Sequence, residues 1–216
     1  LMKRSTKITP YAGISAAVGS FINWGYFTVK AEYGRFFNEA TENSDSFRFE
    51  GAYFTNLHAL KFGKVRHFFS PTFAWGSEMY NSTYKDRITI SNQNEFPTYS
   101  GNFIGTKKLI LRYQTQFYIN KTWKNFHFSP YSIVALGWLS QTNQKLFNAK
   151  TNSKFGIGVI INNPYLVFNN IKISLVYYPN VPFDNKPAFD FNSYRNDMIP
   201  INSFGTDIPH FVNFDH

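Results

Sequence analysis

The chain has 216 residues, no cysteine, 22 Lys and Arg against 13 Asp and Glu, and a net charge of +9. This length favours a single domain, and the lack of cysteine excludes disulfides, thiolate metal ligands and a cysteine nucleophile. Aromatic residues make up 20% of the chain and charged residues only 16%, against about 25% charged residues in ordinary soluble domains. The basic residues are scattered, so we expect no nucleic-acid partner despite the net charge.

Eight stretches alternate apolar with polar or small residues, as strands do when successive side chains point to opposite faces. We expect strands at residues 11–22, 26–37, 46–55, 65–77, 107–118, 126–139, 154–161 and 171–178. Most of them match or exceed the roughly 9–11 residues that a tilted strand needs to cross a bilayer. In the clearest one, Leu109, Leu111 and Tyr113 share an apolar face, and only Ile110 breaks the pattern on the polar face.

Residues 8–29 carry no charge and are long enough for a transmembrane helix of about 20 residues. Pro10, Gly13 and Gly25 interrupt this run, and it has no continuous apolar centre. We therefore favour two strands around a tight turn at Asn23 over a helix or a signal peptide.

The connections between the expected strands alternate between short and long. The short ones lie near Asn23 and at residues 56–64, 120–125 and 162–170. The long ones lie at residues 38–45, 78–106 and 140–153, and the middle one is expected to hold a short extra strand at 87–92. Residues 179–216 form an irregular tail, with a final short strand expected at 210–214.

Long up-and-down strands with turns that are short at one end and long at the other are typical of outer-membrane β-barrels. We expect an all-β, antiparallel, up-and-down transmembrane β-barrel that forms one domain over residues 1–216, with about 8–10 strands. The same alternation fits a soluble β-sandwich or open barrel that binds a ligand or polyanion through basic loops and aromatic residues. Strand length, the loop pattern and the aromatic content favour the membrane barrel.

The five histidines show no metal-ligand spacing, and the sequence contains neither a nucleophile elbow nor a phosphate-binding glycine loop. We expect no enzymatic activity, no cofactor and no metal site. The polar residues opposite the apolar faces are expected to line the lumen: Lys30, Glu32, Arg48, Glu50, Lys108, Arg112, Gln114 and Gln116. Glu32 and Glu50, beside Lys30 and Arg48, fit a lumenal salt-bridge ladder better than an acid/base pair.

Three stretches resemble the C-terminal barrel strands of surface-antigen-type outer-membrane proteins, the superfamily of BamA- and TamA-like assembly and translocation barrels. They read GTKKLIL at 105–111, FSPY and ALGWL within 128–139, and FGIGVIINNPYLVF followed by IKISL within 155–175. The resemblance implies a non-enzymatic protein of the bacterial (Gram-negative) outer membrane that acts in protein or lipid insertion, translocation or passive transport. Its implied partners are outer-membrane lipid and other outer-membrane or periplasmic assembly proteins.

The resemblance also implies that the loop before residue 105 is inserted into the lumen, which makes Tyr99, Gly101 and Gly105 candidate loop residues. The family's Arg-Gly signature has no counterpart there, because residues 96–103 contain no arginine.

Short turns in such barrels face the periplasm, so the first strand must reach the turn near Asn23 from the extracellular side, and the eighth strand likewise ends outside near Pro179. The first strand then forms a free edge at Tyr11 that begins on the wrong side for an exported N-terminus. An open edge in lipid leaves backbone groups unpaired at several kcal/mol each. We therefore expect the chain to be the C-terminal part of a longer barrel.

Overall fold

The computed structural model describes residues 10–37, 44–77, 88–92, 95–99, 103–141, 144–163, 165, 170–182 and 186–191. Strands account for 73% of the described residues, and none of them lies in an α-helix. Nothing in the described part is a helix long and apolar enough to cross a membrane. The expectation of an almost purely β, antiparallel chain is thus confirmed.

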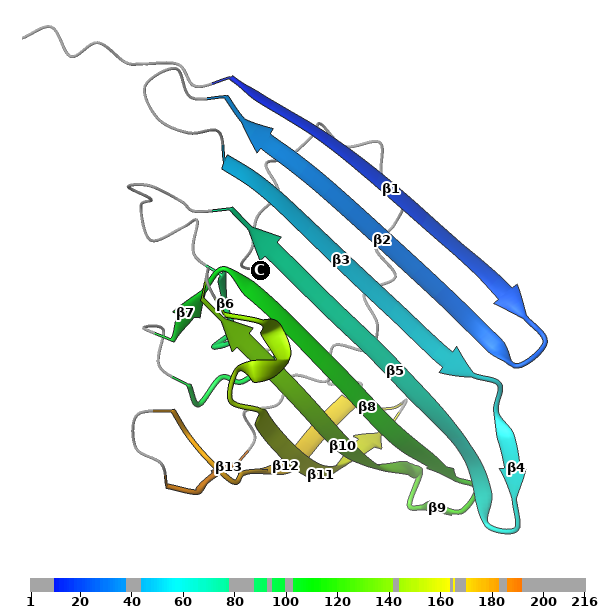
Figure 1. Cartoon of the computed structure of the whole chain (residues 1–216). Helices are drawn as coiled ribbons and strands as arrows, with labels where there is room; N and C mark the ends of the chain where they lie inside the picture. The colour runs from blue at the N-terminus through cyan, green and yellow to red at the C-terminus, as the bar shows by residue number, and fades with distance from the viewer. Residues whose placement is uncertain are drawn as a thin grey trace, which may run out of the picture.

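One large antiparallel sheet contains nearly all of these strands, and its order follows the chain (Figure 1). Its main path runs through β1 (Tyr11–Ile22), β2 (Gly25–Phe36), β3 (Ser44–Thr55), β5 (Gly63–Gly76), β8 (Lys107–Ile119), β10 (Phe126–Ser140), β11 (Asn152–Asn162), β12 (Asn170–Tyr178) and β13 (Ala188–Phe191). Two short strands lie off this path: β4 (His58–Leu60) pairs with β5, and β9 (Thr122–Trp123) pairs with β10.

The long connection between β5 and β8 contains a second, two-stranded sheet made of β6 (Ile88–Thr89) and β7 (Ile104–Gly105). The connection between β10 and β11 contains the 3-10 turn η2 (Leu146–Asn148). All eight expected strands are present within two residues of their expected bounds, and the extra strand expected at 87–92 is reduced to β6. The strand expected at 210–214 lies outside the described residues, and β13 was not expected.

The large sheet is open in the described part of the chain, so these residues do not close into a barrel by themselves. Among the described residues, its two edges are β1, which pairs only with β2, and β13, which pairs only with β12. The two edges are also unequal: β1 pairs along twelve residues, whereas β13 pairs along four. In the part of the chain that the structure describes, the sheet is therefore a curved wall whose edge strands are β1 and β13 (Figure 1).

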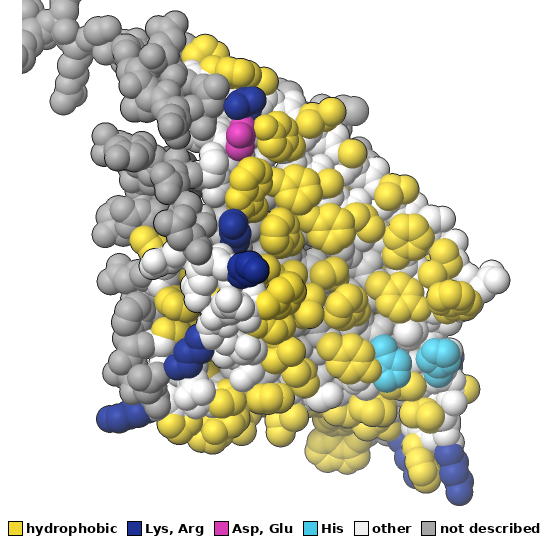
Figure 2. Space-filling model, viewed as in Figure 1, with side chains coloured by type: hydrophobic (Ala, Val, Ile, Leu, Met, Phe, Trp, Pro, Cys, Tyr) yellow, Lys and Arg dark blue, Asp and Glu magenta, His cyan; other side chains and the backbone are white. Residues whose placement is uncertain are grey.

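The two faces of this wall differ in chemistry. The face towards the viewer in Figure 2 is covered by apolar side chains over most of its area, and we call it the outer face. The strand register makes this face continuous, for example through the pairs Phe49–Phe73 and Phe69–Tyr113. Its exposed large apolar residues include Ile14, Val18, Tyr33, Phe69, Tyr113, Phe117, Val134, Phe155, Ile157, Ile173 and Leu175.

The opposite face, which we call the inner face, is covered in part by the connection between β5 and β8. Residues 88–92 and 95–99 of this connection, which we call the inner segment, pack against β8, β10 and β12. The shared cluster contains Ile88, Ile90, Phe96 and Tyr99 of the inner segment, together with Ala74, Ile110, Tyr131, Ile133, Ala135, Leu139, Ile160, Val176 and Tyr178 of the sheet. The buried core of the molecule therefore lies between the inner segment and the inner face of the sheet.

Candidate functional site: the inner face and its inserted segment

The structure places all eight predicted lumen-lining residues on the inner face, in two groups. Lys30 pairs in register with Glu50, and Glu32 with Arg48, across β2 and β3. The other four, Lys108, Arg112, Gln114 and Gln116, follow one another at every second or fourth position along β8. Because β5 alone separates β3 from β8, the two groups belong to one continuous wall.

The group on β2 and β3 consists of two ion pairs. Lys30 Nζ lies 2.6 Å from Glu32 Oε1, and Arg48 Nε donates to Glu50 Oε1 at 2.9 Å. Each pair joins neighbours two residues apart on one strand, and the register sets each cation opposite an acid of the next strand. The four charges thus alternate in sign across and along the two strands. This arrangement suits a charged wall and offers no free carboxylate for acid/base chemistry.

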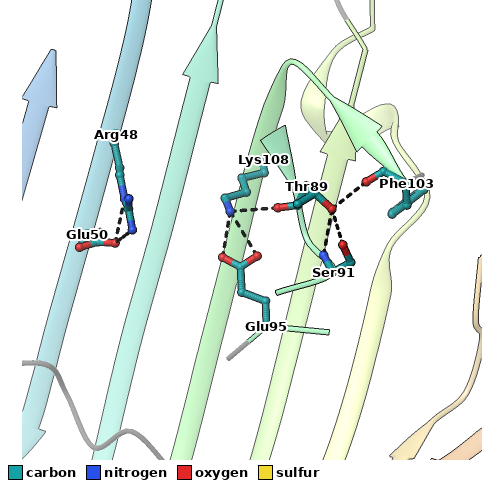
Figure 3. A network of polar contacts seen from close by, with 7 residues as sticks. All are labelled: Arg48, Glu50, Thr89, Ser91, Glu95, Phe103 and Lys108. Carbon is teal, nitrogen blue, oxygen red and sulfur yellow. Dashed lines mark hydrogen bonds and ion pairs between the residues drawn. The ribbon is translucent and has the colours of Figure 1, made fainter. Parts of the chain in front are cut away.

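The group on β8 holds the inner segment through Lys108 (Figure 3). The Lys108 ammonium donates to both carboxylate oxygens of Glu95, at 3.0 and 3.2 Å, and to the carbonyl oxygen of Thr89 at 3.0 Å. The side chain of Lys108 is only 3% exposed and that of Glu95 only 14%. A buried charge is tolerated when it is paired and its remaining hydrogen-bonding groups are satisfied, as they are here.

A second lysine, which the sequence analysis missed, holds the same segment from β11. Lys154 donates to the carbonyl oxygen of Glu95, and its Nζ lies 5.3 Å from the centre of the Phe96 ring. Lys154 begins the expected strand at 154–161, and the alternation with Phe155 already sets its side chain on the inner face, a signal that could have found it. Its register with Ala135 places it on the inner face, with Gly156 and Gly158.

Two aromatic residues, Phe96 and Tyr99, fix the rest of the inner segment. Phe96 packs over Gly137 of β10, where an added Cβ would come within 2.7 Å of the Phe96 ring. Tyr99 donates from its hydroxyl to the carbonyl oxygen of Asn180 at 2.8 Å. Burial raises the pKa of Tyr99, so the phenol stays neutral and keeps this hydrogen bond. The segment is therefore anchored to β8, β10 and β11, and to the chain just after β12.

The three loop residues expected from the sequence have different positions. Tyr99 is a buried anchor of the inner segment, whereas Gly105 lies in β7 and approaches the carbonyl oxygen of Ser140. Gly101 lies outside the described residues. The contacts of Thr89, Glu95 and Phe96 had no signal in the sequence beyond their place before the strand at 107–118.

The described residues contain no group of three or more His, Asp or Glu side chains that could hold a metal ion. The buried polar groups instead tie one segment of the chain to a polar wall. No family model, no curated protein and no solved structure matches the chain.

Proposed function

We propose that this chain forms part of the wall of an integral β-barrel in the bacterial outer membrane, with its outer face towards lipid and its inner face towards the lumen. One observation carries the proposal: the distribution of polarity is inverted. Large apolar residues such as Ile157, Phe155 and Tyr113 are exposed on the outer face, while Lys108, Gln114 and Gln116 are buried on the inner face. In a soluble domain, charged residues are almost never fully buried unless paired, and large apolar patches are normally covered.

Strand length supports the same proposal. β1, β2, β3, β5, β8, β10 and β11 each have 11 to 15 residues, enough to cross a bilayer at a tilt of about 45°. A β-sandwich would cover one face of the sheet with a second sheet. Within the described part of the chain, the only second sheet is the β6–β7 pair, and it lies in the connection that covers the inner face.

The more specific proposal is a non-enzymatic barrel of the surface-antigen type, acting in protein or lipid insertion, translocation or passive transport. The inner segment supports it, because it directly precedes β7 and β8 and occupies the inner face. This is the position at which the family that the sequence resembles has its lumen-inserted loop. In the membrane, β1 and β13 would pair with further strands, since unpaired backbone groups are costly in hydrocarbon.

Fractionation of the source cells tests this proposal. The protein should sediment with outer membranes, resist extraction with alkaline carbonate and require detergent for solubility. It should also show the heat-modifiable gel migration of barrels that stay folded in detergent. Quantitative recovery in buffer without detergent would overturn the proposal and favour a soluble ligand-binding protein.

A further inference from the structure

The tight and short connections gather at one end of the sheet. Each joins neighbouring antiparallel strands from the same side, namely β1 to β2, β3 to β5, β8 to β10 and β11 to β12 (Figure 1). We call the described residues 23–24, 56–62, 120–125, 163 and 165 the short-turn rim.

The charged side chains of the short-turn rim are all positive. Lys61, Lys121 and Lys124 lie within it and are exposed. Lys64 is the second residue of β5 and lies just beyond the rim. The sequence contains no Asp or Glu at residues 51–77 or 96–183, so no carboxylate falls in these turns. The acidic residues gather elsewhere. At the other end of the sheet, for example, Asp45 lies beside a connection that also contains two glutamates.

Large aromatic side chains accompany the lysines. Trp24, Phe62 and Trp123 are 72%, 75% and 63% exposed, which is unusual for rings of this size. Two of them lie beside lysines: Lys61 Nζ is 5.7 Å from the Phe62 ring centre, and Lys124 Nζ is 5.3 Å from that of Trp123. Figure 2 shows cationic and apolar side chains together at the tip of β4 and β5, at the lower right.

The backbone presents these groups at the ends of hairpins. Lys124 and Asn125 have φ angles of 47° and 67°, as in the two-residue type I′ turn of a hairpin, here between β9 and β10. The Lys124 side chain is therefore carried beyond the strand ends, next to Trp123. In the membrane orientation proposed above, the exposed aromatic rings and lysines at the ends of the strands lie at the level of the bilayer headgroups.

We propose that the short-turn rim binds the phosphate headgroups of anionic phospholipids in the leaflet that it faces. The proposal rests on the membrane orientation proposed above. Its specific basis is charge complementarity, since the exposed lysines of the rim have no carboxylate on the same turns to neutralise them. Each lysine near an anionic surface is expected to raise the local preference for anionic lipid about fivefold.

The test measures lipid preference at the protein boundary. The full chain is reconstituted into mixed vesicles of phosphatidylcholine and phosphatidylglycerol, and electron paramagnetic resonance of spin-labelled lipids reports the association of each lipid. We expect phosphatidylglycerol to be favoured, and the preference to fall in the K121Q/K124Q variant by about fivefold per lysine. The matched control is K145Q/K150Q, two exposed lysines of the long connection at the opposite end, which should keep the preference.

The salt dependence of the wild-type protein gives a reading that no folding defect can mimic. Raising the salt to 1 M, where the Debye length is about 3 Å, should abolish the preference. Equal association of the two lipids in the wild type, or equal loss in both variants, would overturn the inference. Flotation of the vesicles after a carbonate wash separates the two proposals: protein that floats without a lipid preference contradicts only the rim, whereas protein that does not float contradicts the membrane orientation.

Discussion

Lys108 and Glu95 form the most buried ion pair of the described residues. Their charges are almost removed from solvent, and Lys108 also satisfies the carbonyl oxygen of Thr89. Removing one partner of such a pair leaves a buried charge without compensation, at about 3–5 kcal/mol. The pair formed by Lys30 and Glu32 is more open, since the side chain of Lys30 is 36% exposed, and exposed pairs contribute about 0–1 kcal/mol.

We therefore expect Lys108→Ala to lower the free energy of unfolding by about 3–5 kcal/mol and Lys30→Ala by less than about 1 kcal/mol. The double variant K108M/E95Q should recover part of the loss, because it removes both charges together. Urea unfolding in detergent micelles, followed by tryptophan fluorescence, measures all three. Equal losses for Lys108→Ala and Lys30→Ala would show that the inner segment is not held by its ion pair.

At the scale of single elements, the strands follow from local sequence because a two-residue period of polarity defines both the strand and its faces. Ile110 is the informative exception. It lies on the inner face among polar neighbours, and its burial follows from the inner segment, which covers this part of β8. An apolar residue on the polar face thus marks the place where another part of the chain packs.

Elements without a long alternation could not be predicted in this way. β13 has four residues between Pro187 and the end of the described part, too few for a periodic signal. β4 and β9 are extensions of hairpins, formed because β5 and β10 reach beyond their neighbours. The position of the inner segment on the sheet could not be predicted either, since contacts such as those of Lys154 join residues about 60 positions apart in the sequence.

The difference between the two faces predicts opposite responses for adjacent residues of β2. Val29 lies on the outer face, and Thr28 lies on the inner face in register with Ala52. Val29→Arg places a cation towards lipid and should cost about 2–4 kcal/mol near the bilayer midplane, whereas Thr28→Arg should cost much less. The folded fraction after refolding into vesicles, read from heat-modifiable migration, compares the two. Similar yields would contradict the assignment of the faces.

At the scale of the whole molecule, the sequence predicted the direction, order and faces of the strands, but not how far the sheet of the described residues curves towards closure. Closure depends on accumulated twist, stagger and the total number of strands, none of which is encoded in a single strand. β1 is the edge on which this matters most. It has twelve residues without a charge or an internal proline, so it lacks two of the devices that protect natural edges from pairing.

Hydrogen exchange at β1 tests whether this edge is paired in the membrane. In an antiparallel strand, every second residue directs its N–H and C=O groups away from the neighbour, so about half of the β1 amides face the free edge. If the sheet spans a bilayer, leaving these groups unpaired in hydrocarbon would cost several kcal/mol each, so a further strand must cover them. We expect the amides of residues 13–19 to exchange as slowly in vesicles as those of β2, with no alternation along β1. The isolated chain in detergent should show fast exchange at every second residue. An alternating pattern that persists in vesicles would mean that β1 is a free edge exposed to water, and that this part of the wall does not cross the membrane.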